Sequence, residues 1–203
     1  MRTTPFTLAV VMALAWGSRA TRAEPIYESA DLGWTGGGSG PGVSTTQFIG
    51  SRFHVDQAVE VTGIGGHLGS DGTIFGALVS LDSPTALPSG SPIVSDPLAV
   101  TTFDAGLRSR DLVVPLSATL EPGDYALIFG SGWFGATGTG FLPANNVVIP
   151  GRSANFWWRR GAWDSVGLTE TRVVVDGIFL DVAAGCRRWR GKKARREPQR
   201  PTR

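Results

Sequence analysis

The segment LEPGDYALIFG (residues 120–130) joins a tight turn to a strand, and it decides the fold class that we expect. Its Pro-Gly pair favours a turn, and the apolar side chains that follow alternate with their neighbours at Tyr125, Leu127 and Phe129. This period of two is typical of a half-buried strand. The form L-x-P-G-x-Y resembles the tyrosine corner of β-sandwiches, in which the hydroxyl of a buried tyrosine bonds a nearby backbone group. We therefore expect this strand to lie in a β-sandwich.

The same alternation continues on both sides of this segment. Alternating stretches rich in Val, Ile, Phe and Thr occur at residues 49–55, 59–62, 75–81, 112–116, 155–158 and 172–180. Turn-forming residues separate them, and no 11-residue window of the body has the 3.6-residue period of an amphipathic helix. The pattern predicts an all-β fold over residues 45–182: an antiparallel, jelly-roll-like β-sandwich of about eight to ten strands.

The first 23 residues have the features of an export signal. Arg2 provides a positive start, residues 6–16 are apolar, and small residues lead to a cleavage site before Glu24, with Ala20 as a competing site. The apolar run is shorter than the roughly 20 residues that span a bilayer. A buried N-terminal helix is the alternative. Residues 24–44 follow as a Gly/Ser-rich N-terminal segment, either a linker or a long loop.

Charge divides the chain into an acidic body and a basic end. Residues 24–185 contain seven Arg, no Lys and sixteen Asp or Glu, for a net charge of −9, whereas residues 186–203 carry +8. The acidic body argues against nucleic acid as a partner, because phosphate binding depends on Lys and Arg. We expect residues 183–203 to be a disordered, solvated tail. Contact with an anionic membrane or a cell-surface polymer, or a mis-called gene end, are the alternatives.

The only cysteine is Cys186, so the body cannot form an internal disulfide and depends on its apolar core. This cysteine usage fits a bacterial exported protein better than a small, disulfide-linked domain.

Four stretches of strand and turn residues form a recognisable set: QFIGSRFHVDQAVEVTGIGGHLG (47–69), IFGALVSLDSPTALPSGSP (74–92), LEPGDYALIFGSGWFGATG (120–138) and NFWWRRGAW (155–163). Together they resemble the body domain of bacterial PEP-CTERM (exosortase-sorted) surface proteins, and the resemblance spans residues 45–178. It implies an exported β-sandwich at the cell surface and brings no catalytic residues. Such proteins usually end in Pro-Glu-Pro, an apolar span and a basic cluster. Here the basic end follows Gly185 directly, so the resemblance does not extend to the sorting segment.

The glycine-rich stretch VTGIGGHLG (residues 61–69) follows a strand but does not fit a dinucleotide-binding loop. Gly63, Gly65 and Gly69 depart from the G-x-G-x-x-G spacing, and the residues that follow cannot begin the required helix. We expect these glycines to permit a bulge or a close approach of strands.

The two histidines, His54 and His67, lie thirteen residues apart and make a weak case for a metal site. Zinc requires three or four ligands, so Asp56 or Asp71 would have to join the two histidines. Oxygen ligands for a structural calcium ion could come from residues 69–73 or from Asp31. We expect no cofactor, with structural calcium as the alternative.

No stretch of the sequence predicts a catalytic centre. There is no G-x-S-x-G motif, and Ser131, which lies between glycines, has no evident base. Glu60, Glu121 and Glu170 fall at turns or on outer strand faces rather than as a pair around a sugar. We expect a non-enzymatic protein, and a secreted hydrolase is the distant alternative.

The aromatic stretch RSANFWWRRGAW (residues 152–163) predicts a hairpin with its turn at residues 159–162. Phe156 and Trp158 should face one side and Trp157 the other. Exposed tryptophan beside arginine suits sugars or protein partners. The candidate ligand-binding residues are Trp157, Trp133, Trp163, Phe134 and Arg159.

Together these patterns predict an exported, non-catalytic β-sandwich with a structural or adhesive role at the cell surface or in the extracellular matrix. A carbohydrate-binding module that uses exposed tryptophans is the alternative. The expected partners are extracellular polysaccharide or other surface proteins, without nucleic acid and without a transmembrane segment in the mature chain.

Overall fold

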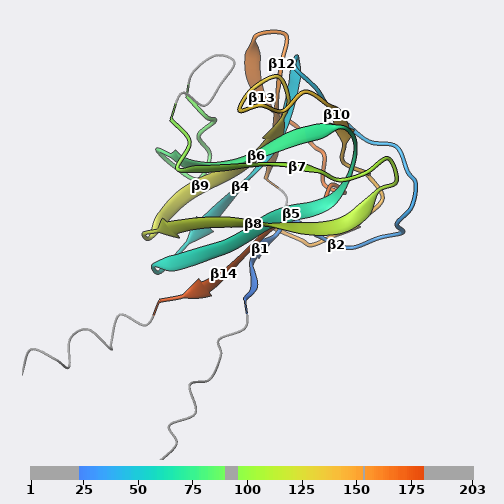
Figure 1. Cartoon of the computed structure of the whole chain (residues 1–203). Helices are drawn as coiled ribbons and strands as arrows, with labels where there is room; N and C mark the ends of the chain where they lie inside the picture. The colour runs from blue at the N-terminus through green and yellow to red at the C-terminus, as the bar shows by residue number, and fades with distance from the viewer. Residues whose placement is uncertain (1–22, 90–95, 153, 181–203) are drawn as a thin grey trace, which may run out of the picture.

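Two antiparallel sheets pack face to face in the computed structural model, which describes residues 23–89, 96–152 and 154–180 (Figure 1). The first sheet has the order β1 (Glu24–Glu28), β14 (Val173–Phe179), β5 (Val59–Asp71), β8 (Arg110–Leu120), and it continues from the end of β5 through β10 (Thr139–Phe141) and β3 (Gly42–Val43). The second has the order β13 (Ala162–Ser165), β12 (Asn155–Arg159), β4 (Gln47–Val55), β9 (Gly123–Gly130), β6 (Thr73–Leu81), β7 (Ala99–Asp104). A small ribbon pairs β2 (Ala30–Asp31) with β11 (Val147–Val148).

The strand pairs are nested around the centre of the chain, between β6 and β7. From there outward, β6 pairs with β7, β5 with β8, β4 with β9 and β1 with β14, all antiparallel. Alternate pairs go to opposite sheets, which is the arrangement of a jelly roll. The expected all-β, antiparallel sandwich is therefore confirmed. Nine of the described strands have five or more residues, and five shorter ones accompany them.

The first sheet begins earlier in the chain than residue 45, where we expected the domain to start. β1 lies within the predicted N-terminal segment 24–44, and its residues pair with Val174–Gly177 of β14. Residues 32–41, between β2 and β3, form no strand, but the backbone N–H of Gly36 donates to the Ser109 carbonyl and the Ala144 N–H donates to the Ser39 carbonyl. This stretch is therefore bonded to the sandwich at several points.

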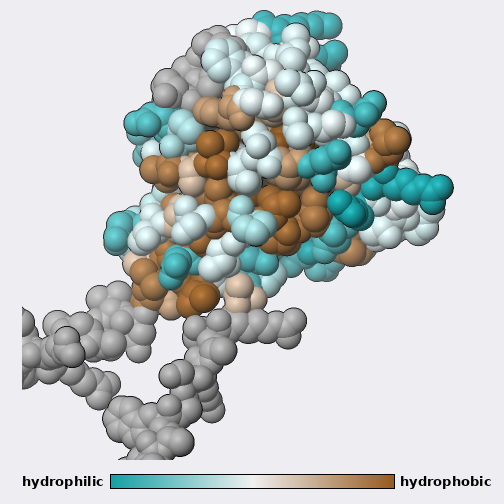
Figure 2. Space-filling view, viewed as in Figure 1, coloured by the Kyte–Doolittle hydropathy of each residue, from teal (hydrophilic) through white to brown (hydrophobic). Residues whose placement is uncertain are grey.

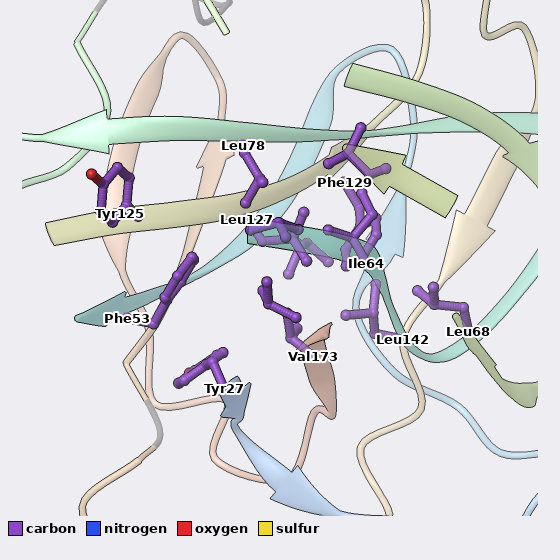
Figure 3. Packing of buried hydrophobic residues seen from close by; sticks show 14 of the residues in the cluster. Tyr27, Phe53, Ile64, Leu68, Leu78, Tyr125, Leu127, Phe129, Leu142 and Val173 are labelled. Atoms are coloured by element: carbon purple, nitrogen blue, oxygen red, sulfur yellow. The ribbon is translucent and has the colours of Figure 1, made fainter. Parts of the chain in front are cut away.

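The core between the sheets contains the alternating side chains Tyr125, Leu127 and Phe129 of β9 (Figure 3). On β6 the alternating apolar set that begins at Phe75 instead lies on the outer face, and Ile74 and Leu78 face the core. Phe129 and Leu127 of β9 are fully buried, as is Ile64 of β5. At one end three rings follow one another: Tyr27 stacks on Phe53 at 5.2 Å between centroids, and Phe53 lies 5.9 Å from Tyr125. Each fully buried side chain of this size contributes about 2 kcal/mol.

The predicted tyrosine corner is present at the start of β9. The ring of Tyr125 is buried, and its hydroxyl donates to the Glu121 carbonyl oxygen at 2.8 Å. This bond closes the Pro-Gly turn against the strand that follows it, as the motif predicts.

Replacing Tyr125 by phenylalanine is expected to lower the free energy of unfolding by about 1 kcal/mol, because the Glu121 carbonyl loses its partner while the ring stays packed. Urea unfolding followed by tryptophan fluorescence measures this change. An unchanged midpoint would show that the corner does not contribute to stability.

The second sheet also buries apolar side chains on its outer face. Phe48, Phe75 and Ile128 are at most 1% exposed there, beneath Leu87, Ala136 and Trp163. This sheet is therefore apolar on both faces, whereas a strand alternation indicates only that one face is buried.

The open side of the sandwich lies between the edge strands β7 and β8, where apolar colour reaches the surface (Figure 2). Leu112, Val114 and Ala99 are partly buried against the core at this side. Pro115 lies in β8 and has no N–H to donate, which limits the addition of another strand at this edge.

The glycines of β5 serve the close strand contacts that their pattern predicted. The register shifts between Val61 and Gly63, which is a bulge against β8. A Cβ at Gly65 would overlap the Leu112 carbonyl of β8, and one at Gly66 would overlap the Arg172 carbonyl on the other side. Because the backbones of the neighbouring strands lie so close, positions 65 and 66 can be occupied only by glycine.

Candidate functional site

The hairpin of β12 and β13 has the geometry that the sequence predicted. Trp158 pairs with Trp163 and Arg159 with Ala162, and the two residues between them, Arg160 and Gly161, have φ angles of 55° and 86°. Two central residues with positive φ form a type I′ turn, which suits the twist of a hairpin. The hairpin lies at the top of Figure 1, at the end of the molecule away from the start of β1 and the end of β14.

Trp157 and Arg159 lie on the side of β12 that faces the main core. Trp157 is half-buried against that core. The guanidinium carbon of Arg159 lies 5.5 Å from the centre of the Trp157 ring, within the range of a cation–π contact. Part of the tryptophan therefore stabilises the sandwich, and the arginine covers the ring.

Trp163 and Phe134 lie on the opposite face of the same sheet. The Trp163 ring meets Phe156 edge-on at 5.4 Å and Phe48 at 6.5 Å, and Phe134 meets Phe75 at 5.2 Å. Because Phe48 contacts Phe75 and Trp158 as well, these rings form one continuous aromatic cluster. Their main role is packing over the outer face.

Trp133 lies apart from the hairpin, in the loop that follows β9. Its side chain is 44% exposed, and its carbonyl accepts the Ala136 N–H within the same loop. Of the five candidate residues, the structure thus brings Trp157, Trp163 and Arg159 together at the hairpin, joins Phe134 to Trp163 only through other rings, and leaves Trp133 separate.

Two clefts adjoin the hairpin and share its arginines. One, of about 320 Å³, is lined by Trp157, Trp163, Ala162, Asp164, Arg159 and Arg160. The other, of about 490 Å³, is lined by Gly42, Ser44, Thr46, Gln47, Arg159 and Arg160. The first offers indole surface and a carboxylate, and the second offers hydroxyl and amide groups. Within the described part of the chain, neither arginine forms an ion pair.

A third pocket, of about 330 Å³, lies near the start of β12, and no local sequence pattern predicted it. Arg52, His54 and Arg152 line it together with Ile26, Tyr27, Phe53, Pro84, Gly151 and Ala154. The Tyr27 hydroxyl bonds the Ser51 hydroxyl at 2.6 Å and donates to the Arg152 carbonyl at 2.9 Å. Burial raises the pKa of Tyr27 to about 12, so the phenol is neutral at ordinary pH.

His54 is held between two carboxylates beside this pocket. Its Nδ1 lies 2.7 Å from Asp124 Oδ1, and its Nε2 lies 3.2 Å from Asp56 Oδ1. The hydrogen bond to Asp124, assisted by the charges of both aspartates, raises the pKa of His54 above its usual value of 6.5. Since each ring nitrogen already has a carboxylate partner, the group is arranged as an ion-pair triad.

The His54 pKa should be measurable directly by NMR titration of the imidazole. We expect a value above 6.5 in the wild type and a lower one in Asp124→Asn, because the largest cause of the shift is removed. A raised folded-state pKa stabilises the protein below the unfolded pKa, and this contribution is lost as the pH rises through the folded value. Equal pKa values in both proteins would contradict this assignment.

His67 forms a different, completely buried network with Ser109 and Asn146. Its Nε2 lies 3.0 Å from Ser109 Oγ, and its Nδ1 lies 2.9 Å from Asn146 Oδ1. A serine, an imidazole and an amide in this order resemble a nucleophile, a base and an orienting group. However, all three side chains are at most 5% exposed, so no substrate can reach the serine.

The outer bonds of this network go to loop backbone. Ser109 Oγ donates to the Gly37 carbonyl at 2.7 Å, and Asn146 Nδ2 donates to the carbonyls of Pro143 and Glu170 at 2.8 and 2.7 Å. The three side chains therefore fix loops from four parts of the chain against β5. Residues so far apart in sequence leave no local motif, which is why the pattern did not predict this contact.

Arg172 is the centre of a second polar network, which joins β1 to β8 on opposite sides of the first sheet. Its side chain donates to both carboxylate oxygens of Asp111 at 3.0 and 3.3 Å, donates to the Ala30 carbonyl at 2.8 Å and pairs with Glu28. Burial lowers the pKa of Arg172 and raises that of Asp111. Both shifts favour the neutral forms, so the hydrogen bonds and ion pairs of Arg172 offset the cost of desolvating these charges only in part.

Among the described residues, no three His, Cys, Asp or Glu side chains are placed to hold a metal ion. Near the predicted calcium loop, Ser70 donates to Asp104 Oδ1 at 3.1 Å and accepts from the Ala105 N–H at 2.8 Å. Asp31 lies in β2, away from residues 69–73 in sequence. The calcium alternative stays a prediction.

Trp34 is an exposed aromatic residue that the sequence reasoning did not select. It is 69% exposed, beside the half-exposed Leu32. Its carbonyl accepts from Asn145 Nδ2 at 2.9 Å, which holds the Gly-rich loop near β11. A single tryptophan among glycines gives no periodic signal, so only the structure reveals its exposure.

No family model and no curated protein sequence matches this chain. Across the residues that the structure describes, no helix has the length and apolarity needed to cross a membrane.

Proposed function

We propose that this chain is an exported, non-catalytic β-sandwich protein with a structural or adhesive role at the cell surface or in the extracellular matrix. The buried network of His67, Ser109 and Asn146 carries this proposal. These three residues are of the types that form a hydrolytic centre. In the described chain they are buried, and their hydrogen bonds hold loops together instead of facing a pocket. Arg172 has a similar structural use, since it joins β1, β2 and β8.

The N-terminal pattern supports export. β1 begins at Glu24, the residue that follows the predicted cleavage site. Cleavage there, or after Ala20, would leave every described strand intact. An acidic body stabilised by packing without an internal disulfide is compatible with that destination.

Mass spectrometry of the protein isolated from fractions of its host tests this proposal. We expect the extracellular or surface fraction to contain a chain that begins at Glu24 or Thr21. A chain that keeps Arg2 and stays in the cytoplasm would overturn the proposed export. Labelling of Ser109 or Ser131 by a fluorophosphonate probe would overturn the non-catalytic role.

Carbohydrate binding is the second candidate function, and the hairpin favours it. The cleft at β13 combines the exposed parts of two half-buried indoles, Trp157 and Trp163, with Arg159, and indole surface beside hydrogen-bond donors suits sugar rings. The named tryptophans do not share one flat surface, so this candidate rests on the cleft alone.

A further inference from the structure

The arginines of the acidic body are concentrated around β12. Of the seven in residues 24–185, four lie on or beside this strand: Arg52, Arg152, Arg159 and Arg160, here called the basic edge because only the short strand β13 lies outside β12 in its sheet. Arg52 is adjacent because its N–H donates to the Ala154 carbonyl at 3.1 Å. The excess of positive charge is clearest at the hairpin, where Arg159 and Arg160 share a cleft with the single carboxylate of Asp164.

Each end of the basic edge opens into a pocket of mixed character. At the start of β12, Arg52 and Arg152 line the pocket beside Tyr27. At its end, Arg159 and Arg160 line both clefts of the hairpin. Arg52 lies over the Phe156 ring on the outer face of the second sheet, whereas Arg159 lies with Trp157 on the core-facing side. The contacts proposed below are therefore those at the hairpin end.

The side chains that line the two hairpin clefts indicate the kind of ligand that they can bind. Guanidinium groups bind carboxylates in a two-point geometry. The exposed edges of Trp157 and Trp163 can contact the apolar face of a sugar ring, and Ser44, Thr46 and Gln47 can bond its hydroxyls. Asp164, the cross-strand partner of Trp157, can accept a further hydroxyl. A polymer with both sugar rings and carboxylates matches this set.

We propose that the basic edge binds an acidic, carboxylate-bearing polysaccharide, with Arg159 and Arg160 as its main carboxylate contacts. This inference rests on the adhesive role proposed above and names the partner. The acidic remainder of the body repels the polymer elsewhere, so that binding is confined to this edge.

Binding of the full chain to polygalacturonate at 150 mM NaCl tests the inference, with dextran as the neutral probe and a single-stranded oligonucleotide as the phosphate probe. Arg159→Gln/Arg160→Gln should weaken polygalacturonate binding about tenfold, because two charge-assisted contacts are lost. The matched control is Arg108→Gln/Arg110→Gln, which removes the same charge from exposed positions near β8. It should change the affinity less than twofold.

The basic residues 186–203 are present in every variant, so their contribution cancels in this comparison. Equal losses in the two variants would overturn the inference, since binding would then follow net charge. An equal loss of oligonucleotide binding in Arg159→Gln/Arg160→Gln would also overturn it, because these arginines would then recognise phosphate as well as an acidic sugar.

Phenylglyoxal labelling of arginine, read by mass spectrometry, locates the contact independently. Polygalacturonate should protect Arg159 and Arg160 several-fold while Arg108 and Arg110 stay reactive. Protection of all four alike, or of none, would overturn the assigned edge. The binding assay and the arginine labelling both use purified protein. Either can fail while the export test succeeds, and the export test can fail while both succeed.

Discussion

Replacement of Arg172 by methionine is expected to lower the free energy of unfolding by about 3 kcal/mol. The methionine fills much of the same space, but Asp111 and Glu28 then lie near each other without the guanidinium that joins them. Removing one partner of a buried ion pair typically costs about 3–5 kcal/mol. The lower figure applies because the Asp111 side chain keeps 34% of its exposure.

Chemical denaturation at pH 7 measures this loss, and Arg110→Met is the matched control. Arg110 is exposed on the same strand as Asp111, so its replacement should change stability by less than about 0.5 kcal/mol. Burial already raises the pKa of Asp111 in the wild type, and loss of the guanidinium should raise it further. The stability difference from wild type should therefore narrow as the pH falls through the folded-state pKa of Asp111. Similar losses in both variants would show that Arg172 has no special structural role.

Gly65→Ala is expected to destabilise the fold by about 3 kcal/mol or more, because its Cβ would overlap the backbone of Leu112. A backbone atom cannot turn away as a side chain can, so β5 and β8 would have to separate locally. These strands share nine paired positions, and the loss should appear as a lower thermal midpoint with cooperative unfolding retained.

Gly167→Ala provides the contrast within the same chain. A Cβ at Gly167 meets nothing within 4 Å, so the substitution should be neutral or stabilise by a few tenths of a kcal/mol through the unfolded chain. If both alanine variants unfolded alike, the close approach of β5 and β8 at Gly65 would not be the cause of the glycine requirement.

The sequence predicted the fold class and the main strands because period-two alternation is a local signal. Tyr125 and the β12–β13 turn were both placed correctly, since each depends on a few neighbouring residues. β1 was not predicted: it has five residues, includes Pro25 and owes its strand form to the distant partner β14.

The candidate site was predicted less completely, for a physical reason. Alternation places Trp157 opposite Phe156 and Trp158, but it does not reveal that apolar groups cover both faces of the second sheet. Trp133 was grouped with the hairpin by residue type alone, and the structure leaves it in a separate loop. Arg52 and Arg152 become neighbours only through the pairing of β4 with the segment before β12.

The nesting of strand pairs has a consequence for the order of events in biosynthesis. The partner of β1 is β14, so about 145 residues must be added after Glu28 before the first strand can pair. At 5–20 residues per second this delay is on the order of ten seconds. Contacts so distant in sequence also make folding slow, in the millisecond-to-second range. The newly made chain therefore keeps its N-terminal strand unpaired until its last strand emerges.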